Sequence, residues 1–247
     1  KGQVQFEAKG LCLIISPWNY PLNLSICPLV HAIAAGNAVI LKPSELSPAT
    51  SAFIQKMISS LFDKSEVAVF EGDASISTFL LEQKFDHIFF TGSPAIGKVV
   101  MAAAAQHLTS VTLELGGKSP AIVGPEVNVE EAAAKLAWGK FLNNGQTCIA
   151  PDYLYLHEKN YFSFLKALES TVESFYGKNI AKSADYGRIV NRRHFDRIVS
   201  LIEDAKEKGA QVLFGGKTDA DDCFIEPTVL VNCTPEMRIM QEEIFGP

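Results

Sequence analysis

The chain has 247 residues, of which 47% are hydrophobic and 20% charged, and its formal net charge is −6. A chain of this size can bury enough apolar surface to fold as one or two globular domains without disulfide or metal staples. The acidic balance argues against nucleic acid as a partner, and the longest apolar runs are far shorter than the roughly 20 residues that span a bilayer. The five cysteines include no pair at metal-ligand spacing, so we expect no metal and a reducing, cytoplasmic location.

Short β-rich runs alternate with amphipathic helical stretches, which is the pattern of βα units that build a parallel sheet. The predicted strands are residues 11–16, 38–42, 66–70, 87–91, 111–115, 121–123, 153–157 and 228–232. The sequence therefore predicts an α/β fold.

Three of the intervening helices are marked by their ends. Ser47 and Pro48 offer an N-cap and a first-turn proline, and Asn128 offers a second N-cap. A third helix, residues 192–208, is predicted to close on Gly209. Apolar residues recur at helical spacing after Pro48, and these are Phe53, Met57, Ile58 and Leu61.

A glycine pair, Gly116 and Gly117, interrupts a strand-like run and is the best candidate for a hinge between two lobes. It divides the chain into two predicted domains, residues 1–115 and 116–247. Because the chain begins at Lys1 without methionine and stops just after a strongly patterned segment, we expect a fragment of a longer protein. Both domains are then expected to be partial.

Cys148 lies in a polar, glycine-containing turn, residues 143–150, that follows an alanine-rich helical stretch. A thiol reacts as its thiolate, which requires partial exposure and local positive potential, and this turn is such a setting. Cys12 and Cys27 lie among apolar residues and are predicted to be small core residues. On local grounds alone an incidental loop thiol is the more common arrangement, so other segments must decide the role of Cys148.

A strand that ends at Gly92 is followed by Ser93 and by a helical stretch that contains Gly97. Such a turn offers backbone N–H groups and a helix dipole to an anion. The glycine spacing is not the Gly-x-Gly-x-x-Gly fingerprint, and Pro94 removes one N–H. A plain βα connection therefore remains a serious alternative to an anion site.

Two further acidic residues stand near strand ends. Glu45, with Lys42, follows a strand end where the pair could meet a ribose and its neighbouring phosphate, although a solvated turn is the simpler alternative. Glu114 lies between two leucines, and burial of a carboxylate there is costly. If Glu114 faces a cleft it is suited to general-base work, whereas in an alternating strand it would face solvent.

Taken together, these segments resemble the aldehyde dehydrogenase superfamily across essentially the whole chain. Six motifs follow the order found in that family, at residues 17–21, 42–45, 90–93, 113–118, 145–148 and 242–247. The segments 138–141, 148–153 and 185–188 resemble the class 3 branch, which includes the fatty aldehyde dehydrogenases. This resemblance implies that residues 1–115 form an NAD(P)-binding lobe with a Rossmann-type parallel sheet, and that residues 116–247 form an α/β catalytic lobe. Both lobes are then truncated.

The resemblance also implies a reaction, the NAD(P)-dependent oxidation of aldehydes to carboxylic acids. The Cys148 thiolate would attack the aldehyde carbon, and the Asn19 side-chain amide and the Cys148 N–H would hold the resulting oxyanion. Glu114 would then activate the water that hydrolyses the thioester.

The same resemblance assigns cofactor contacts. Lys42 and Glu45 would hold the adenosine ribose, Glu243 the nicotinamide ribose, and Phe245 would pack near the nicotinamide ring. The remaining residues expected to contact the cofactor are Gly92, Ser93, Gly97 and Leu115, with Gly92 and Ser93 at the pyrophosphate.

Glu45 bears on the choice of cofactor, because a carboxylate beside the ribose 2′-hydroxyl repels a 2′-phosphate. We therefore expect NAD to be favoured, with NADP also used, as is common in class 3. The branch further implies medium- or long-chain aliphatic or aromatic aldehydes and a homodimer. Membrane association is expected only if a region beyond this chain carries an anchor.

Two alternatives remain open from the sequence. A CoA-acylating aldehyde dehydrogenase shares the fold and the cysteine, but that branch typically lacks the glutamate base, so Glu114 counts against it. A noncatalytic fragment that only binds nucleotide is the second alternative, because segments that complete both lobes in the family lie outside this chain. For the same reason we expect the isolated chain to be poorly active.

Overall fold

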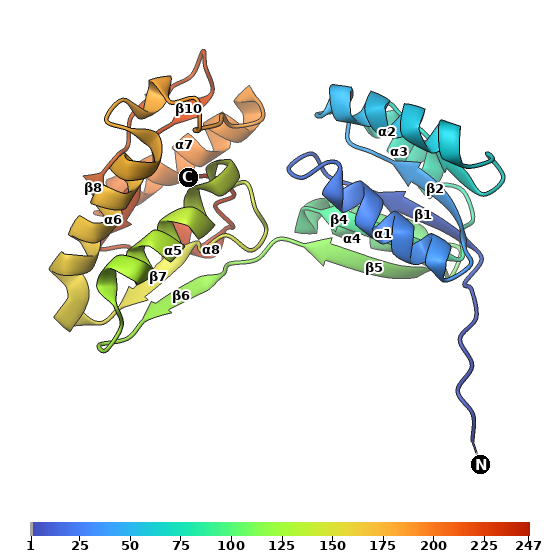
Figure 1. The fold of residues 1–247 in the computed structure, drawn as a ribbon, viewed down its shortest axis with the longest axis horizontal. Coiled ribbons are helices and arrows are strands. Elements are labelled where there is room, and N and C mark those ends of the chain that lie inside the picture. The colour runs from blue at the N-terminus through green and yellow to red at the C-terminus, as the bar shows by residue number, and fades with distance from the viewer. Residues whose placement is uncertain (1) are drawn as a thin grey trace. The chain divides into compact units, whose positions relative to one another are not determined.

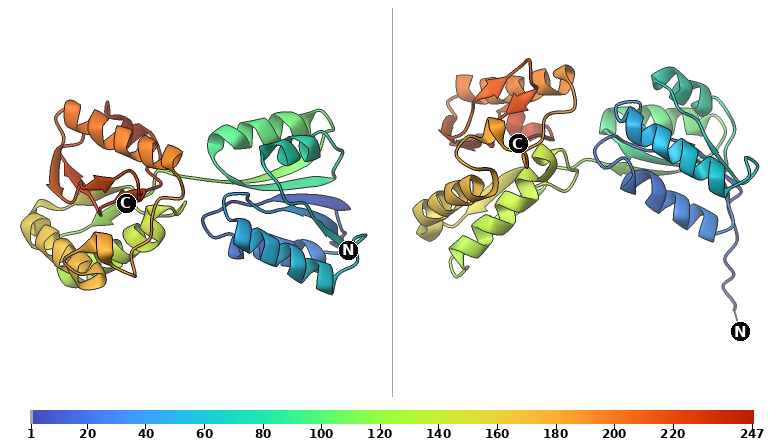
Figure 2. Two further views of the ribbon diagram at one scale, coloured as in Figure 1. Left: turned by 90° about the horizontal axis from the view of Figure 1, so that it is seen from above. Right: turned by 45° about the horizontal axis from the view of Figure 1, so that its top comes forward.

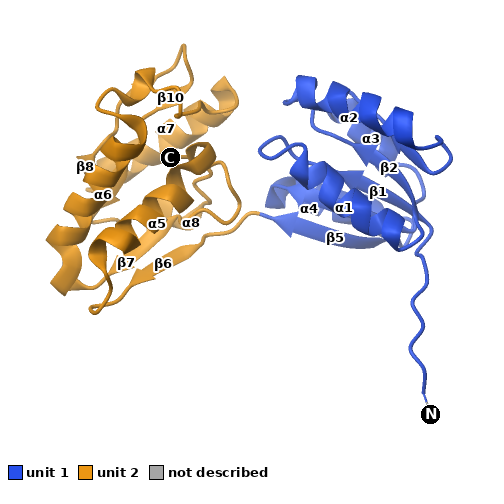
Figure 3. Cartoon of the chain, in the orientation of Figure 1, with its two compact units in different colours: residues 1–115 blue, residues 116–247 orange. Residues whose placement is uncertain are grey.

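The computed structural model describes residues 2–247 and divides into two compact units (Figures 1 and 3). The first, unit 1, ends at Leu115, and the second, unit 2, comprises Gly116–Pro247.

Unit 1 contains a five-stranded sheet in which every neighbouring pair of strands is parallel. The strand order is β3-β2-β1-β4-β5. The strands are β1 (Leu11–Ile15), β2 (Ala38–Lys42), β3 (Val67–Val69), β4 (His87–Gly92) and β5 (Ser110–Leu115). This is the parallel sheet that the alternating pattern predicts.

Helices cover both faces of this sheet (Figure 2). The helices are α1 (Asn23–Ala34), α2 (Pro48–Leu61), α3 (Ala74–Leu81) and α4 (Pro94–Ala105). Successive residues of β1 point to opposite faces, so Leu13 and Ile15 join the apolar cluster under α3 and α4. Cys12 and Ile14 join the cluster under α1 and α2. Unit 1 is therefore a doubly wound α/β domain.

The carboxyl ends of parallel strands lie at one edge of a sheet, and this edge collects the predicted site segments of unit 1. The strand order reverses at β1 and β4, because β2 and β3 lie to one side and β5 to the other. In open α/β sheets ligands bind beside the carboxyl ends of the strands at such a reversal. The fold thus places the segments after β1, β2, β4 and β5 where a ligand is expected.

Unit 2 combines three pairs of strands with helices and short turns. Its strands are β6 (Pro120–Val123) parallel to β7 (Tyr153–Leu156), β8 (Gln211–Phe214) antiparallel to β11 (Val229–Val231), and β9 (Thr218–Asp219) antiparallel to β10 (Phe224–Ile225). Its helices are α5 (Val129–Phe141), α6 (Tyr161–Tyr176), α7 (Arg192–Glu207) and α8 (Arg238–Gln241). Its 3-10 turns are η1 (Leu142–Gly145), η2 (Glu158–Asn160) and η3 (Ile180–Lys182).

The predicted helix ends are confirmed in unit 2. The Asn128 side chain accepts a hydrogen bond from Glu131 N at 3.0 Å and so caps α5. Helix α7 ends at Glu207, and Gly209 beyond it adopts a φ of 101°, the left-handed conformation that glycine tolerates best.

Helix α2 differs from its prediction in two respects. Ser47 is the N-cap residue, but its hydroxyl donates to the Ser44 carbonyl oxygen at 3.3 Å and does not cap the helix. Of the predicted apolar set, Ile58 is buried and Met57 packs against the core, whereas Phe53 and Leu61 are 55% and 66% exposed. The buried face of α2 includes Ile54 instead, so the predicted apolar face is only partly confirmed.

The prediction for Cys12 is confirmed, and that for Cys27 is wrong. Cys12 is 4% exposed, but Cys27 lies on the exposed side of α1, where its thiol donates to Asn23 Oδ1 at 3.0 Å. Helix α1 buries Ser25 and Leu29. Cys27 is two positions from both Ser25 and Leu29, which is a rotation of about 200° around the helix axis. Its side chain therefore points away from the buried face.

Each of the eight predicted strands is present, and each of its ends lies within one residue of the prediction. The prediction missed β8, β9 and β10, which are short, and β8 and β9 are mostly exposed. Such strands lack the buried apolar alternation that marks a strand in sequence. None of the helices within residues 2–247 is long and apolar enough to cross a bilayer.

Candidate active site

The turn after β1 carries Asn19, the residue expected to supply an amide donor. Ser16 N donates to the Lys42 carbonyl oxygen at 3.1 Å, which continues the pairing of β1 with β2 into this turn. Asn19 is partly buried, and its Oδ1 atom is buried. Asn19 also lines an open apolar groove of unit 1, whose walls include Tyr20, Leu22 and Phe53. The amide thus lies beside a surface that suits a hydrocarbon chain.

Lys42 and Glu45 form an ion pair at the carboxyl end of β2. The Lys42 Nζ and Glu45 Oε2 atoms are 2.7 Å apart, and the two side chains are 3% and 40% exposed. Partial burial opposes ionisation of Glu45, but the hydrogen bond and the charge of Lys42 outweigh it, so the pKa of Glu45 lies below its usual value. The pair therefore presents an ionised carboxylate at the ligand edge of the sheet.

The turn between β4 and α4 is held by Ser93. Ser93 is the N-cap of α4, its hydroxyl accepts from Ile96 N at 3.4 Å, and its carbonyl accepts from Gly97 N at 2.9 Å. Pro94 follows and has no N–H. Ser93 already accepts hydrogen bonds from two N–H groups of this first turn. A phosphate would therefore have to compete with the Ser93 oxygens for these donors.

Gly97 explains how closely α4 approaches the end of β5. A Cβ atom added at Gly97 would lie 2.9 Å from Leu115 Cδ2, which is closer than real contacts of this kind. Gly97 is buried, so the glycine has a packing role, and Leu115 is the residue on which it packs. Both predicted cofactor residues therefore lie at the ligand edge of unit 1.

Glu114 is exposed near the end of β5, whereas its neighbours Leu113 and Leu115 pack against the cluster under α3 and α4. Within unit 1 this is the alternating-strand arrangement, in which the carboxylate points away from the core. The Glu114 side chain is therefore accessible to water at the ligand edge of the sheet.

In unit 2, Cys148 occupies the second position of a tight turn. Ala150 N donates to the Thr147 carbonyl oxygen at 3.0 Å, which closes the turn around Cys148 and Ile149. Cys148 is partly exposed, whereas the preceding residues 144–146 are buried. The thiol therefore meets the exposure condition for a reactive cysteine, on a turn whose base is fixed.

The backbone before Cys148 runs through three successive left-handed residues. Asn143, Asn144 and Gly145 have φ angles of 51°, 55° and 68°. Asparagine and glycine are the residues that adopt this conformation most readily, so the sequence Asn-Asn-Gly ends α5 and redirects the chain. A Cβ atom at Gly145 would collide with the Gly246 carbonyl oxygen. The Cys148 turn thus packs directly on the backbone of the segment that follows α8.

That segment carries Glu243 and Phe245. Gly117 N donates to Glu243 Oε1 at 3.2 Å, and a Cβ atom at Gly116 would overlap the Glu243 carboxylate. Gly116 therefore makes room for Glu243, and the Gly117 N–H binds it. Burial, together with the nearby Asp152, raises the pKa of Glu243 above its usual value despite the hydrogen bond from Gly117.

Asp152 links the segments that meet around Cys148. Its side chain is 3% exposed and accepts from Lys118 Nζ at 3.2 Å, from Lys140 Nζ at 3.5 Å and from Ile244 N at 3.1 Å. Burial lowers the pKa of Lys140, although the Asp152 carboxylate opposes that shift. One buried carboxylate thus joins the turn after Gly117, the end of α5 and the segment that carries Glu243.

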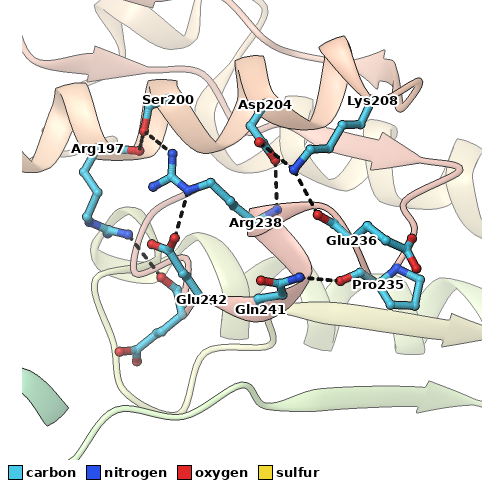
Figure 4. A network of polar contacts seen from close by, with 10 residues as sticks. Arg197, Ser200, Asp204, Lys208, Pro235, Glu236, Arg238, Gln241 and Glu242 are labelled. Atoms are coloured by element: carbon cyan, nitrogen blue, oxygen red, sulfur yellow. Dashed lines mark hydrogen bonds and ion pairs between the residues drawn. The ribbon is translucent and has the colours of Figure 1, made fainter.

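Helix α7 supports the same segment from its other side. Arg197 donates to the carbonyl oxygens of Glu243 at 3.1 Å and Ile244 at 2.6 Å. Further polar contacts join α7 to residues 235–242, including the hydrogen bond from Arg238 N to Asp204 Oδ2 at 2.8 Å (Figure 4). The backbone around Glu243 and Phe245 is therefore fixed at several points, and Phe245 has a left-handed φ of 46°.

The predicted site residues form two groups, one in each unit. Unit 2 brings Cys148, Glu243 and Phe245 together through contacts between their segments. Unit 1 carries Asn19, Lys42, Glu45, Gly92, Ser93, Gly97, Glu114 and Leu115 along the ligand edge of its sheet. Each group therefore mixes residues expected to be catalytic with residues expected to contact the cofactor.

Comparison with known proteins identifies the class. The family model described as the aldehyde dehydrogenase family matches residues 1–247. The chain is 50% identical over 247 residues to a Bacillus subtilis (strain 168) protein named AldX, covering 99% of this chain and 56% of that protein. It is 49% identical over 244 residues to aldehyde dehydrogenase family 3 member A2 of Pongo abelii, covering 99% and 49%. The chain belongs to the aldehyde dehydrogenase family.

A solved structure gives the same result for the fold. The substrate-bound state of Staphylococcus aureus AldH matches with a TM-score of 0.91 and 47% identity, covering 98% of this chain and 52% of that one. The predicted α/β fold with a parallel cofactor-type sheet is therefore confirmed, and the likeness to family 3 supports the predicted branch. The chain spans about half the length of the relatives that it matches.

Sequence reasoning did not assign a role to three residues that build the site of unit 2. These are Gln146, Asp152 and Arg197, which contact backbone atoms far away in sequence. Gln146 and Asp152 lie within segments that carry the family resemblance, and Arg197 lies within a predicted helix, but no local pattern reveals which segments these side chains join.

Proposed function

We propose that the protein oxidises aldehydes to carboxylic acids with NAD or NADP, and that Cys148 is its nucleophile. The observation that carries the proposal is the partly exposed Cys148 turn, fixed at its base and packed on the segment that carries Glu243. A thiol on an accessible turn with a fixed base, next to the segment that we propose contacts the nucleotide, suits covalent catalysis.

The proposed chemistry begins when the Cys148 thiolate forms a C–S bond to the aldehyde carbon. The carbonyl oxygen becomes an oxyanion, which the Cys148 N–H and the Asn19 side-chain amide stabilise by about 3–4 kcal/mol per donor. A bound nicotinamide would supply the hydride acceptor for this adduct, and Cys148 would then carry the acyl group as a thioester. Glu114 then takes a proton from the water that attacks the thioester, the acid departs, and the Cys148 thiolate is regenerated.

We assign cofactor binding to unit 1 and the nucleophile to unit 2. The doubly wound sheet of unit 1 fits a dinucleotide, because Lys42 and Glu45 stand at the carboxyl end of β2 and Ser93 and Gly97 stand where β4 meets α4. Glu45, held ionised by Lys42, would accept hydrogen bonds from the adenosine ribose. That charge repels a 2′-phosphate, so we propose that NAD is favoured and NADP is also used.

We propose aldehydes with medium or long aliphatic chains, or aromatic ones, as substrates. The groove beside Asn19 is lined largely by apolar side chains, among them Leu22, Ile26, Phe53 and Met57. Burial of hydrocarbon stabilises binding by about 0.8 kcal/mol per methylene group, so such a groove discriminates by chain length. A cytoplasmic homodimer stays a prediction.

The test is the appearance of reduced nicotinamide when the purified protein, in its natural length, is given a medium-chain aldehyde and NAD, with Cys148→Ala beside it. We expect turnover in the native protein and none in the variant. Equal turnover in both would exclude Cys148 as the nucleophile. Cys233→Ala is the matched control, because Cys233 is also partly exposed in unit 2 and has no proposed role.

Two outcomes would point to the alternative functions. Formation of an acyl-CoA when CoA is added would favour the CoA-acylating reaction, against which the accessible Glu114 counts. Nucleotide binding without turnover would favour a noncatalytic nucleotide-binding protein. Measurement of NAD binding by calorimetry beside the activity assay distinguishes this last outcome from a protein that has lost its fold.

A further inference from the structure

Gln146 is a buried polar residue to which the proposed chemistry gives no role. It stands two positions before Cys148 and is 2% exposed. An amide costs free energy to bury unless its hydrogen bonds are made inside the protein. The partners that Gln146 engages therefore indicate what its burial accomplishes.

The Gln146 amide bonds three backbone groups from two segments. Its Nε2 donates to the carbonyl oxygens of Asn143 and Arg188, each at 3.1 Å. Its Oε1 accepts from Val190 N at 2.9 Å. One side chain thus spans the start of the Cys148 turn and joins it to residues 188–190, more than 40 positions away in sequence.

Residues 188–190 are a fixed anchor. Ile189 N donates to the Cys223 carbonyl oxygen at 3.1 Å, and Arg188 Nε is 2.7 Å from Asp222 Oδ2. Arg188 Nη2 also donates to the Ala181 carbonyl oxygen at 2.7 Å. The segment that receives Gln146 is therefore also tied to two other parts of unit 2.

The turn that Gln146 bridges needs such support. Residues 143–145 are all left-handed, a conformation that costs free energy for residues other than glycine and persists only where the surroundings enforce it. A rotation in this stretch would carry Cys148 with it. Gln146 bonds the carbonyl of Asn143, the first of these residues, so its amide opposes that rotation.

We infer that Gln146 is a positioning residue, whose three hydrogen bonds hold the Cys148 thiol and the Cys148 N–H in one geometry. The inference rests on the proposed role of Cys148 as nucleophile. Gln146 touches neither the substrate nor the cofactor in this account, and it acts through the backbone of the turn. Misplacement of reacting groups by about 1 Å can cost on the order of 100-fold in rate.

Two variants separate the hydrogen bonds from the volume of the side chain. Gln146→Met keeps the length of the side chain and removes all three bonds. Gln146→Glu keeps the acceptor for Val190 N and loses the donors to Asn143 and Arg188, and a protonated carboxyl group regains one of them. Gln211→Glu and Gln211→Met are matched controls, because Gln211 is an exposed glutamine of β8 in the same unit.

The measurements use the purified protein in its natural length, well below its unfolding temperature. We would measure kcat and KM for NAD and aldehyde, and separately the alkylation of Cys148 by iodoacetamide across pH, read from the Cys148 peptide by mass spectrometry. We expect Gln146→Met to lower kcat by about 10- to 100-fold, with KM for NAD changed less than about twofold. We also expect its Cys148 alkylation rate to differ severalfold from the native rate.

Gln146→Glu gives a second readout, which would not depend on pH in this way if Gln146 only stabilised the fold. Its Cys148 alkylation rate relative to the native protein should approach one as pH falls and the new carboxyl group becomes protonated. If Gln146→Met does not fold, this variant alone decides. Native alkylation rates and native kcat in the folded variants would overturn the inference.

The inference and the proposed function can fail separately. If the native protein does not oxidise aldehydes but Gln146→Met changes the alkylation of Cys148, the proposed function fails and the positioning role stands. If the native protein turns over and Cys148→Ala does not, while the Gln146 variants match the native protein in both readouts, the positioning role fails.

Discussion

Units 1 and 2 build their parts of the site by different physical means. In unit 1 the ligand edge follows from the sheet, because parallel strands bring their carboxyl ends to one side and Lys42, Gly92 and Glu114 come with them. In unit 2 the site is made of loops, held by buried polar side chains and by glycines that allow backbones to touch. The first kind of site should tolerate single changes better than the second.

The largest effect is expected at Gly145, where unit 2 depends on direct backbone contact. In Gly145→Ala the new methyl group would collide with the Gly246 carbonyl oxygen, and the φ of 68° would be strained besides. We expect a loss of activity of at least 100-fold and destabilisation on the order of 3 kcal/mol.

Gly209→Ala is the matched control for that experiment. Gly209 has a left-handed φ of 101° and nothing within 4 Å of an added Cβ atom, so it carries the strain without the collision. It should lose only about 1 kcal/mol in thermal or chemical unfolding and keep its activity. Similar losses of stability in both variants would mean that backbone strain, and not the collision with Gly246, destabilises Gly145→Ala.

Asp152 is expected to show the next largest effect. Asp152→Asn keeps the shape of the side chain but removes the carboxylate that Lys118 and Lys140 share. We expect destabilisation by about 2–3 kcal/mol in urea unfolding, below the full value for a buried pair because both lysines are partly exposed.

The control for Asp152 is an exposed pair of the same type. Asp196→Asn breaks the Arg192–Asp196 pair on the surface of α7, where both side chains are more than half exposed. Its effect should lie between about 0 and 1 kcal/mol. If the two variants are equally stable, Asp152 does not hold the segments of unit 2 together.

A pH dependence follows from the raised pKa of Glu243. A carboxylate accepts hydrogen bonds from ribose hydroxyls, and its protonated form accepts fewer. Because burial raises this pKa, KM for NAD should rise as pH falls through a range above the ordinary glutamate value of about 4.3. Steady-state kinetics from pH 8 to pH 5 would show it, and Glu243→Gln should remove the dependence while raising KM throughout.

The smallest effect is expected in unit 1, at Glu45. Glu45→Gln removes the carboxylate that would repel a 2′-phosphate and frees Lys42 to attract it. We expect the ratio of kcat/KM for NADP to that for NAD to rise by about tenfold, which corresponds to about 1.4 kcal/mol. Glu66→Gln is the control, because Glu66 is exposed and directly precedes β3, at the opposite edge of the sheet from Glu45. An unchanged ratio would mean that Glu45 does not determine the preference for NAD over NADP.

The sequence predicted unit 1 better than unit 2 for the same reason that the two sites differ. Strands β1, β2, β4 and β5 are marked by apolar runs, and the parallel arrangement then places their carboxyl ends together. The site of unit 2 depends on contacts such as Gln146 with Val190 and Asp152 with Ile244, which no local pattern encodes. The motifs around Cys148 and Glu243 predict two segments that contact each other in unit 2, but they do not show what holds those segments in place.

The errors at Cys27 and α2 have a related cause. An apolar run predicts that a helix has a buried side, but its rotation depends on the packing partner. Thus α1 turns Cys27 outward, and α2 buries Ile54 in place of Phe53. Phe53 instead lines the groove beside Asn19, where an exposed aromatic residue supports the proposed apolar substrate.

The most direct test of the account is to trap the covalent intermediate. In Glu114→Gln the proposed base for hydrolysis is absent, so an aldehyde and NAD should leave an acyl group on the protein. Mass spectrometry of the digested protein should find that group on the Cys148 peptide, with one equivalent of reduced nicotinamide released in a burst. An acyl group on another cysteine, or a burst with no acylated peptide, would contradict Cys148 as the nucleophile.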